Sequence, residues 1–155
     1  MATTVGQVQA VIEQLWPIAG AEGWDAPGLL AGSPSSAVSS ILLAVDTVLD
    51  TVDEAAGHDL LLVHHPLLLR GVTSIAEDRY KGAALSRLIR SNTALIAAHT
   101  NADVVETGTS AVFAQHLGLH DVAPIVASGG NPARGIGRVG KIGRASCRER
   151  VSVVV

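Results

Sequence analysis

The feature that most constrains the fold is a regular alternation of short apolar runs with amphipathic segments. An amphipathic helix at residues 4–16 and a short strand near residues 28–31 come first. Further strands are expected at 40–45, 59–63 and 93–98, and further helices at 46–56, 79–90 and 109–117. Strands and helices that alternate through short connections are typical of an α/β domain with a largely parallel, mixed sheet and flanking helices.

The composition excludes several classes of protein. The 155 residues are 48% hydrophobic and 16% charged, which supplies a core for one domain and excludes a disordered chain. A net charge of −3 and 3% aromatic residues offer nucleic acid neither a basic patch nor stacking rings. No apolar run approaches the roughly 20 residues of a membrane span. The first residues lack a signal-peptide pattern, and the single cysteine, Cys147, has no internal partner. We therefore expect a cytoplasmic protein with neither nucleic acid nor membrane as a partner.

Polar clusters follow the expected strands at the points where these strands end. His64 and His65 come directly after the strand at 59–63, and His99 and Asp103 follow the strand at 93–98. Right-handed crossovers place the carboxyl ends of parallel strands at one edge of the sheet, so these side chains are expected to converge there. Imidazole and carboxylate are ligands for zinc, iron, manganese or nickel, and neighbouring ligands of this kind can serve two metals.

Simpler interpretations exist for some of the polar residues. A histidine beside an apolar strand is most often a surface or hydrogen-bonded residue, although two clusters at matching strand ends favour a metal site. Asp46 follows the first strand of the alternation and is better explained as a helix N-cap than as a ligand. His58, His116 and His120 are weaker candidates, and Glu106 is a minor candidate for a general base.

Several familiar catalytic motifs are absent from the sequence. There is no G-x-x-x-x-G-K-[ST] loop, no strand-linked G-x-G-x-x-G, no C-x-x-C, no H-E-x-x-H and no G-x-S-x-G. A serine or cysteine nucleophile is therefore disfavoured, and no catalytic residue is assigned.

Four segments occur together in an order and spacing that point to one family. They are Trp24-Asp-Ala-Pro-Gly-Leu29, Asp59-Leu-Leu-Leu-Val-His-His-Pro-Leu67, Ala98-His-Thr-Asn-Ala-Asp103 and Gly137-Arg-Val-Gly140. This set resembles the GTP cyclohydrolase 1 type 2 homologues, a family of toroidal hexamers with dinuclear metal centres.

The resemblance implies roles for the polar residues. His64, His65 and Asp103 match the family's N-terminal metal ligands, and His99 lies beside them in the same site. It also implies two divalent metal ions, a homohexamer and a small-molecule substrate that the sequence does not identify. The family closes its site with a His-x-x-x-Glu motif, and no histidine here is followed by glutamate four positions on. Residues 1–140 are therefore expected to form the N-terminal half of the family's domain, with an incomplete fold.

The last fifteen residues differ from the rest of the sequence. Residues 141–155 carry a net charge of +3 and the only cysteine, whereas residues 1–140 carry −6. Residues 142–151 resemble the translated read-through of a sequencing-library adapter. We expect 141–155 to be a non-native, extended and poorly packed tail on a truncated reading frame.

The sequence supports one main hypothesis of function and two alternatives. The main hypothesis is a metal-binding protein with hydrolase-type dinuclear chemistry in its full-length form, in which the metals activate a bridging water. The truncated chain alone is then expected to bind metal weakly and to be inactive. The alternatives are a non-catalytic, metal-loaded oligomeric scaffold or regulatory protein, and a metal-dependent phosphoesterase.

Overall fold

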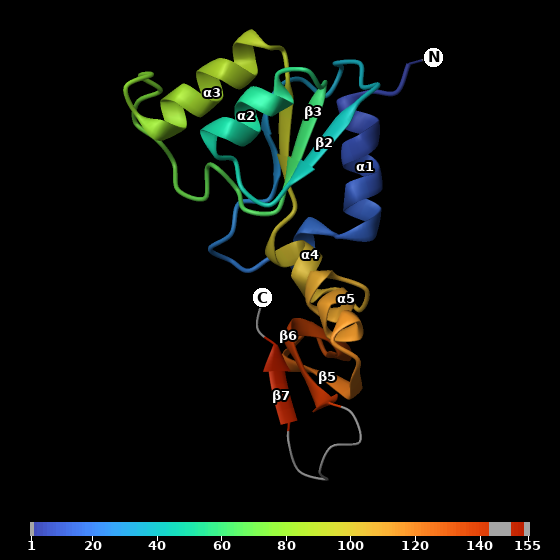
Figure 1. Cartoon of the computed structure of the whole chain (residues 1–155). Helices are drawn as coiled ribbons and strands as arrows, with labels where there is room; N and C mark the ends of the chain where they lie inside the picture. The colour runs from blue at the N-terminus through green and yellow to red at the C-terminus, as the bar shows by residue number, and fades with distance from the viewer. Residues whose placement is uncertain (1, 143–149, 154–155) are drawn as a thin grey trace. The chain divides into compact units, whose positions relative to one another are not determined.

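The structure is a computed structural model that describes residues 2–142 and 150–153. The chain divides into two compact units, which are described separately (Figure 1). The first unit comprises Met1–Ile18 and Gly23–His99, and the second comprises Ala19–Glu22 and Thr100–Val155. None of the helices in the described part of the chain is long and apolar enough to cross a membrane.

The first unit is an α/β fold built on a four-stranded mixed sheet. Its elements are α1 (Val5–Leu15), β1 (Gly28–Ala31), β2 (Ile41–Ala44), α2 (Leu49–Ala55), β3 (Leu60–Val63), α3 (Tyr80–Arg90) and β4 (Ala94–Ala97), and the short 3₁₀ helix η1 (Ile18–Gly20) lies at the boundary of the units. The strand order is β1-β4-β3-β2, with β2, β3 and β4 parallel and β1 antiparallel to β4. The expected α/β class and mixed sheet are confirmed, and the alternation of the sequence maps onto these elements.

The first helix begins at a capping box. The Thr4 backbone N–H donates to the side chain of Gln7, and the Gln7 backbone N–H donates to the Thr4 hydroxyl. Val5 and Ile12 are buried, as their spacing predicts, whereas Leu15 is 58% exposed at the end of the helix. The buried face of α1 therefore ends before Leu15, although the apolar pattern in the sequence extends to it.

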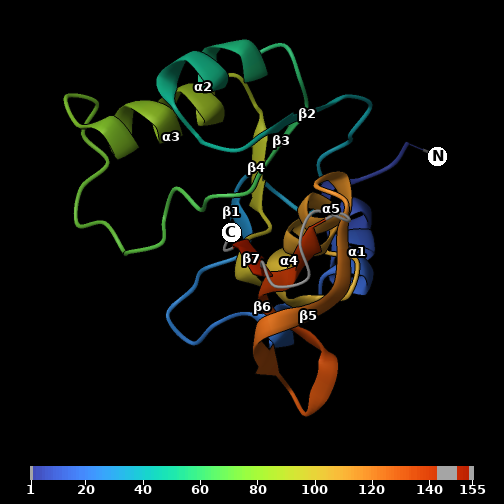
Figure 2. The same ribbon diagram turned by 60° about the horizontal axis from the view of Figure 1, so that its bottom comes forward.

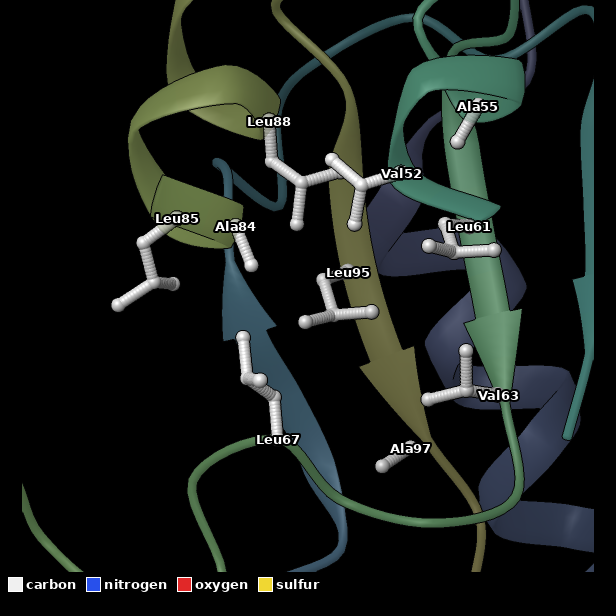
Figure 3. Packing of buried hydrophobic residues seen from close by; sticks show 10 residues of the cluster. All are labelled: Val52, Ala55, Leu61, Val63, Leu67, Ala84, Leu85, Leu88, Leu95 and Ala97. Atoms are coloured by element: carbon white, nitrogen blue, oxygen red, sulfur yellow. The ribbon is translucent and has the colours of Figure 1, made fainter. Parts of the chain in front are cut away.

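The main core lies between the sheet and helices α2 and α3. Figure 3 shows these side chains pointing into one space: Val52, Ala55, Leu61, Val63, Leu67, Ala84, Leu85, Leu88, Leu95 and Ala97. Successive residues of a strand face opposite sides of the sheet. Leu61 and Leu95 therefore face α2 and α3, while Leu60 and Ile96 are buried on the other face, on which α1 lies (Figures 1 and 3).

Asp59 joins the start of β3 to the segment that leads into β2. Its carboxylate accepts hydrogen bonds from the backbone N–H and hydroxyl of Ser39, at 2.8 and 2.7 Å, and of Ser40, at 3.0 and 3.2 Å. These bonds, led by that from the Ser39 backbone, lower the pKa of Asp59 from 3.8 to about 2. The ionised carboxylate thus helps to hold two parallel strands in register.

The lowered pKa of Asp59 predicts a stability contribution that depends on pH. Because the unfolded chain binds this proton more readily, the contribution is complete above about pH 4 and is lost as pH falls towards about 2. The difference between the urea midpoints of the parent chain and Asp59→Asn, measured at pH 6, 4 and 2.5, should narrow as the pH falls. A difference between them that stays constant across this range would contradict the assignment.

The second unit combines two helices with an antiparallel sheet. Its elements are α4 (Thr100–Val104), α5 (Thr109–His116), β5 (Leu119–Ser128), β6 (Asn131–Ile142) and β7 (Arg150–Val153), in the sheet order β5-β6-β7 (Figure 2). Ser128 pairs with Asn131 across a two-residue turn of Gly129 and Gly130, which both have positive φ. Two-residue hairpin turns need this conformation, which glycine adopts without strain.

Arg138 ties β6 to the end of α4. Its side chain is buried and donates to the carbonyls of Gly135, at 2.6 Å, Gly137, at 2.8 Å, and Val105, at 2.9 Å. Burial lowers the pKa of this guanidinium. The Gly137-Arg-Val-Gly140 segment therefore has a structural role in which one cation satisfies three carbonyl groups.

The end of the chain is partly described by the structure. Strand β6 continues through Gly140 to Ile142, and Arg150–Val153 pairs with it in antiparallel register along residues 138–141. These four residues are extended, as expected, but they belong to a sheet. Residues 143–149, which include Cys147, and residues 154–155 lie outside the described residues. That residues 141–155 form a non-native tail stays a prediction.

Candidate metal centre

The register of the parallel strands brings three loops to one edge of the first unit. Ala44 of β2 and Ala97 of β4 both pair with Val63 of β3, so the three strands end level with one another. The backbone N–H of His64 donates to Ala44, and that of Ala98 donates to Val63. Residues directly after these strands therefore meet at the carboxyl edge of the sheet, where ligand sites of such sheets lie.

Three histidines converge at this edge, as the sequence predicts. The ligand atoms of His64, His65 and His99 lie within 4.8 Å of one another. Their ring centroids are 5.0 Å apart for His64 and His65, 5.1 Å for His64 and His99, and 5.5 Å for His65 and His99. Imidazoles at this spacing form a group that could hold a metal ion.

Each of the three rings is oriented by an acceptor at its Nδ1 atom. His64 Nδ1 donates to the carbonyl of Ala98 at 2.9 Å, and His65 Nδ1 donates to Asp46 Oδ1 at 2.8 Å. His99 Nδ1 donates to Asp25 Oδ1 at 2.8 Å. Carbonyl and carboxylate oxygens only accept, so the proton of each neutral ring lies on Nδ1 and the lone pair lies on Nε2. This is the arrangement in which metal-binding histidines are usually held.

Asp25 is a site residue that sequence reasoning did not single out. Its side chain is fully buried beside His99, whose side chain is 15% exposed. Strand β1 runs antiparallel to β4 and pairs Gly28 with Ala97, so the residues that precede β1 lie at the same edge as His99. The only signal in the sequence was that Asp25 belongs to the family-like segment that begins at Trp24. The residues alone did not show the direction of β1, and so they did not show that Asp25 lies beside His99.

Asp46 has a different role from the one that its position predicts. Helix α2 begins at Leu49, its N-cap is Val48, and no side chain caps it. Asp46 instead lies in the loop that follows β2 and accepts a hydrogen bond from His65. Both side chains are about half exposed. The N-cap interpretation is therefore wrong, because the helix starts later than the polar residues suggest.

The other candidate residues lie in the second unit or in loops. Asp103 is buried in α4, and its carboxylate accepts a hydrogen bond from the Thr109 hydroxyl; its role as a metal ligand stays a prediction. Glu106 accepts a hydrogen bond from Asn131 at 3.1 Å, and His116 Nδ1 donates to the Val112 carbonyl. These contacts are structural hydrogen bonds.

A family model matches nearly the whole chain. The match to Duf34/NIF3 (NGG1p interacting factor 3) covers residues 3–154. The chain belongs to the Duf34/NIF3 family. The resemblance inferred from the four sequence segments is confirmed, since relatives of this Duf34/NIF3 chain carry the name GTP cyclohydrolase 1 type 2 homolog.

The curated relatives are considerably longer than this Duf34/NIF3 chain. The homolog of Streptomyces coelicolor is 45% identical over 139 residues, which are 87% of this chain and 49% of the relative. The homolog of Mycobacterium tuberculosis is 43% identical over 119 residues, which are 77% of this chain and 31% of the relative. The chain thus spans about half the length, or less, of these relatives.

Solved structures of similar fold cover the same part of the Duf34/NIF3 chain. The crystal structure of hypothetical protein SA1388 of Staphylococcus aureus matches with a TM-score of 0.76 and 33% identity, over 81% of this chain and 42% of that one. Reduced HcgD from Methanocaldococcus jannaschii matches with a TM-score of 0.78 and 25% identity, over 90% and 54%. The fold assignment is therefore consistent with these neighbours.

Proposed function

We propose that this chain is the metal-binding part of a Duf34/NIF3 protein and that His64, His65 and His99 hold a divalent metal ion. The observation that carries the proposal is the convergence of three imidazoles whose Nδ1 atoms all donate to fixed acceptors. We include Asp103 as a further ligand, and two metal ions in the full-length protein. Zinc, iron, manganese and nickel all suit such a donor set.

The residues of the chain orient the donors and leave the centre accessible. The buried Asp25 orients His99, and the Ala98 carbonyl orients His64. The half-exposed Asp46 accepts a hydrogen bond from His65. His65 is 51% exposed, so a small molecule can approach the cluster from solvent. A divalent metal bound there supplies Lewis-acid polarisation and water activation for hydrolysis.

The reaction and the assembly belong to the full-length protein. The name of the curated relatives supports a hydrolase of the GTP cyclohydrolase type, with a guanine nucleotide as substrate. We further propose a cytoplasmic homohexamer, as the family resemblance implies. Because this chain spans about half of its relatives, we expect it to bind metal weakly and to show no turnover of GTP.

Metal uptake by the whole chain tests the proposal directly. The protein is dialysed against zinc, manganese, iron(II) or nickel, and the bound metal is measured by elemental analysis and by competition with a chromophoric chelator. Uptake of at least one metal that is lost in His64→Ala is the expected result. No uptake of any of the four by the parent chain would sink the proposal.

Loss of the buried Asp25 charge should weaken the metal site without altering its ligands. Carboxylates that hold metal-binding histidines are worth about 10–100-fold in metal affinity. Because Asp25 is fully buried and Asp46 is about half exposed, Asp25→Asn should lower zinc affinity at least about tenfold and Asp46→Asn should lower it less. Chelator competition gives both affinities. Equal zinc affinity in Asp25→Asn and the parent would show that Asp25 does not orient His99.

A further inference from the structure

The histidine cluster has a large exposed aromatic side chain at its side. Trp24 is 60% exposed, and its ring centroid lies 5.9 Å from that of His99, with an interplanar angle of 77°. The next residue, Asp25, is buried and hydrogen-bonded to His99. The backbone at Trp24 is thereby held against the cluster while most of the indole surface remains in contact with solvent.

Trp24 is the one large apolar side chain in the segment that leads into β1. Gly23 has no side chain and the Asp25 side chain is buried, so the two chain neighbours add no exposed apolar surface. A protein interface of ordinary size needs about 800 Å² on each partner, with a continuous core of contacts. One indole beside the His99 imidazole instead offers a flat apolar face next to polar nitrogen atoms, which matches a planar heteroaromatic molecule.

We propose that Trp24 is a stacking platform for the planar heteroaromatic ring of a ligand that reacts at the histidine cluster. This inference rests on the proposed function and adds to it the residue that binds the ring of the ligand. A ring in van der Waals contact lies about 3.5–4 Å from the indole plane. Because the His99 ring lies 5.9 Å from the indole and nearly perpendicular to it, a ring stacked on the indole would lie close to His99. Trp24 binds the ring, and the histidines and their metal bind its reactive edge.

Guanosine is the probe that tests the stacking role, because it carries a planar bicyclic ring and no phosphate charge. The zinc-treated parent chain, Trp24→Leu and Trp24→Phe are titrated with guanosine in a calorimeter, and with ribose as a control that lacks the base. Bound zinc is measured on the same samples. Since Trp24 is mostly exposed, neither substitution disturbs the core.

The expected result separates stacking from simple loss of volume. Stacking of a base on an aromatic side chain predicts that Trp24→Leu weakens guanosine binding about tenfold or more, whereas Trp24→Phe retains most of the affinity. Ribose should not bind measurably, and all three proteins should take up the same amount of zinc. Equal guanosine affinity in the parent and Trp24→Leu, or no guanosine binding by a zinc-loaded parent, would overturn the inference alone. A parent chain that takes up none of zinc, manganese, iron(II) and nickel would instead refute the proposed function.

Discussion

Replacing His65 with alanine should remove metal binding while the fold remains intact. The substitution deletes one of three converging imidazoles, so zinc affinity should fall by more than the roughly 10–100-fold that loss of a supporting partner costs. His65 follows the end of β3 and is 51% exposed, so its removal leaves no cavity in the core. Elemental analysis gives the bound metal, and a thermal melt of the metal-free proteins gives the stability.

His116→Ala is the matched control for His65→Ala. His116 is also an exposed histidine, but its Nδ1 donates to the Val112 carbonyl within α5. The control should bind metal as the parent does. Full metal occupancy in His65→Ala would refute its assignment as a ligand, and unfolding of metal-free His65→Ala would show that the residue supports the fold instead.

Truncation of Leu95 should cause the largest loss of stability among the substitutions considered. Leu95 lies in the middle of β4, is completely buried, and points into the cluster formed with α2 and α3. Deleting most of a buried leucine side chain removes apolar contacts and leaves a cavity, at a cost of about 2–5 kcal/mol. Urea denaturation followed by circular dichroism should show a lower midpoint with an unchanged slope.

Leu43→Ala provides the control for the effect of burial. The substitution is chemically the same and lies in the same sheet, but Leu43 is 71% exposed on the edge strand β2. Its truncation should change the free energy of unfolding by about 0.5 kcal/mol or less. A similar loss of stability in Leu43→Ala and Leu95→Ala would contradict the placement of the core between the sheet and α2 and α3.

The sequence by itself determined the order of elements in the first unit. Apolar runs such as Leu60–Val63 and Ala94–Ala97 are too short for helices, and polar residues lie close to both of their ends, so their strand character is a local property. The convergence of His64, His65 and His99 also followed from the sequence. Parallel strands joined by right-handed crossovers bring their carboxyl ends together whatever their side chains are.

The helix expected at 109–117 is confirmed as α5, but the sheet of the second unit could not be predicted in the same way. The segments that form β5 and β6 contain Pro124 and several glycines, and most side chains of β5 are exposed, so no alternation of apolar and polar residues marks these strands. Their structure depends on backbone pairing with each other and on contacts such as those of Arg138 with Gly135 and Val105. This pairing is local in the chain, and the Gly129-Gly130 turn starts it without any apolar pattern in the strands.

The partners of the histidines were decided only by the tertiary structure. Asp46 reads locally as a helix cap, and it becomes a partner of His65 because β2 and β3 end level with each other. Asp25 is 74 residues from His99, and the two meet because β1 enters the sheet antiparallel to β4. Polar residues that directly follow a strand form a local pattern, which can be recognised in the sequence. The pairing of two strands that are far apart in the chain is set by the free energy of the whole sheet, and it is this pairing that places a buried carboxylate behind an imidazole.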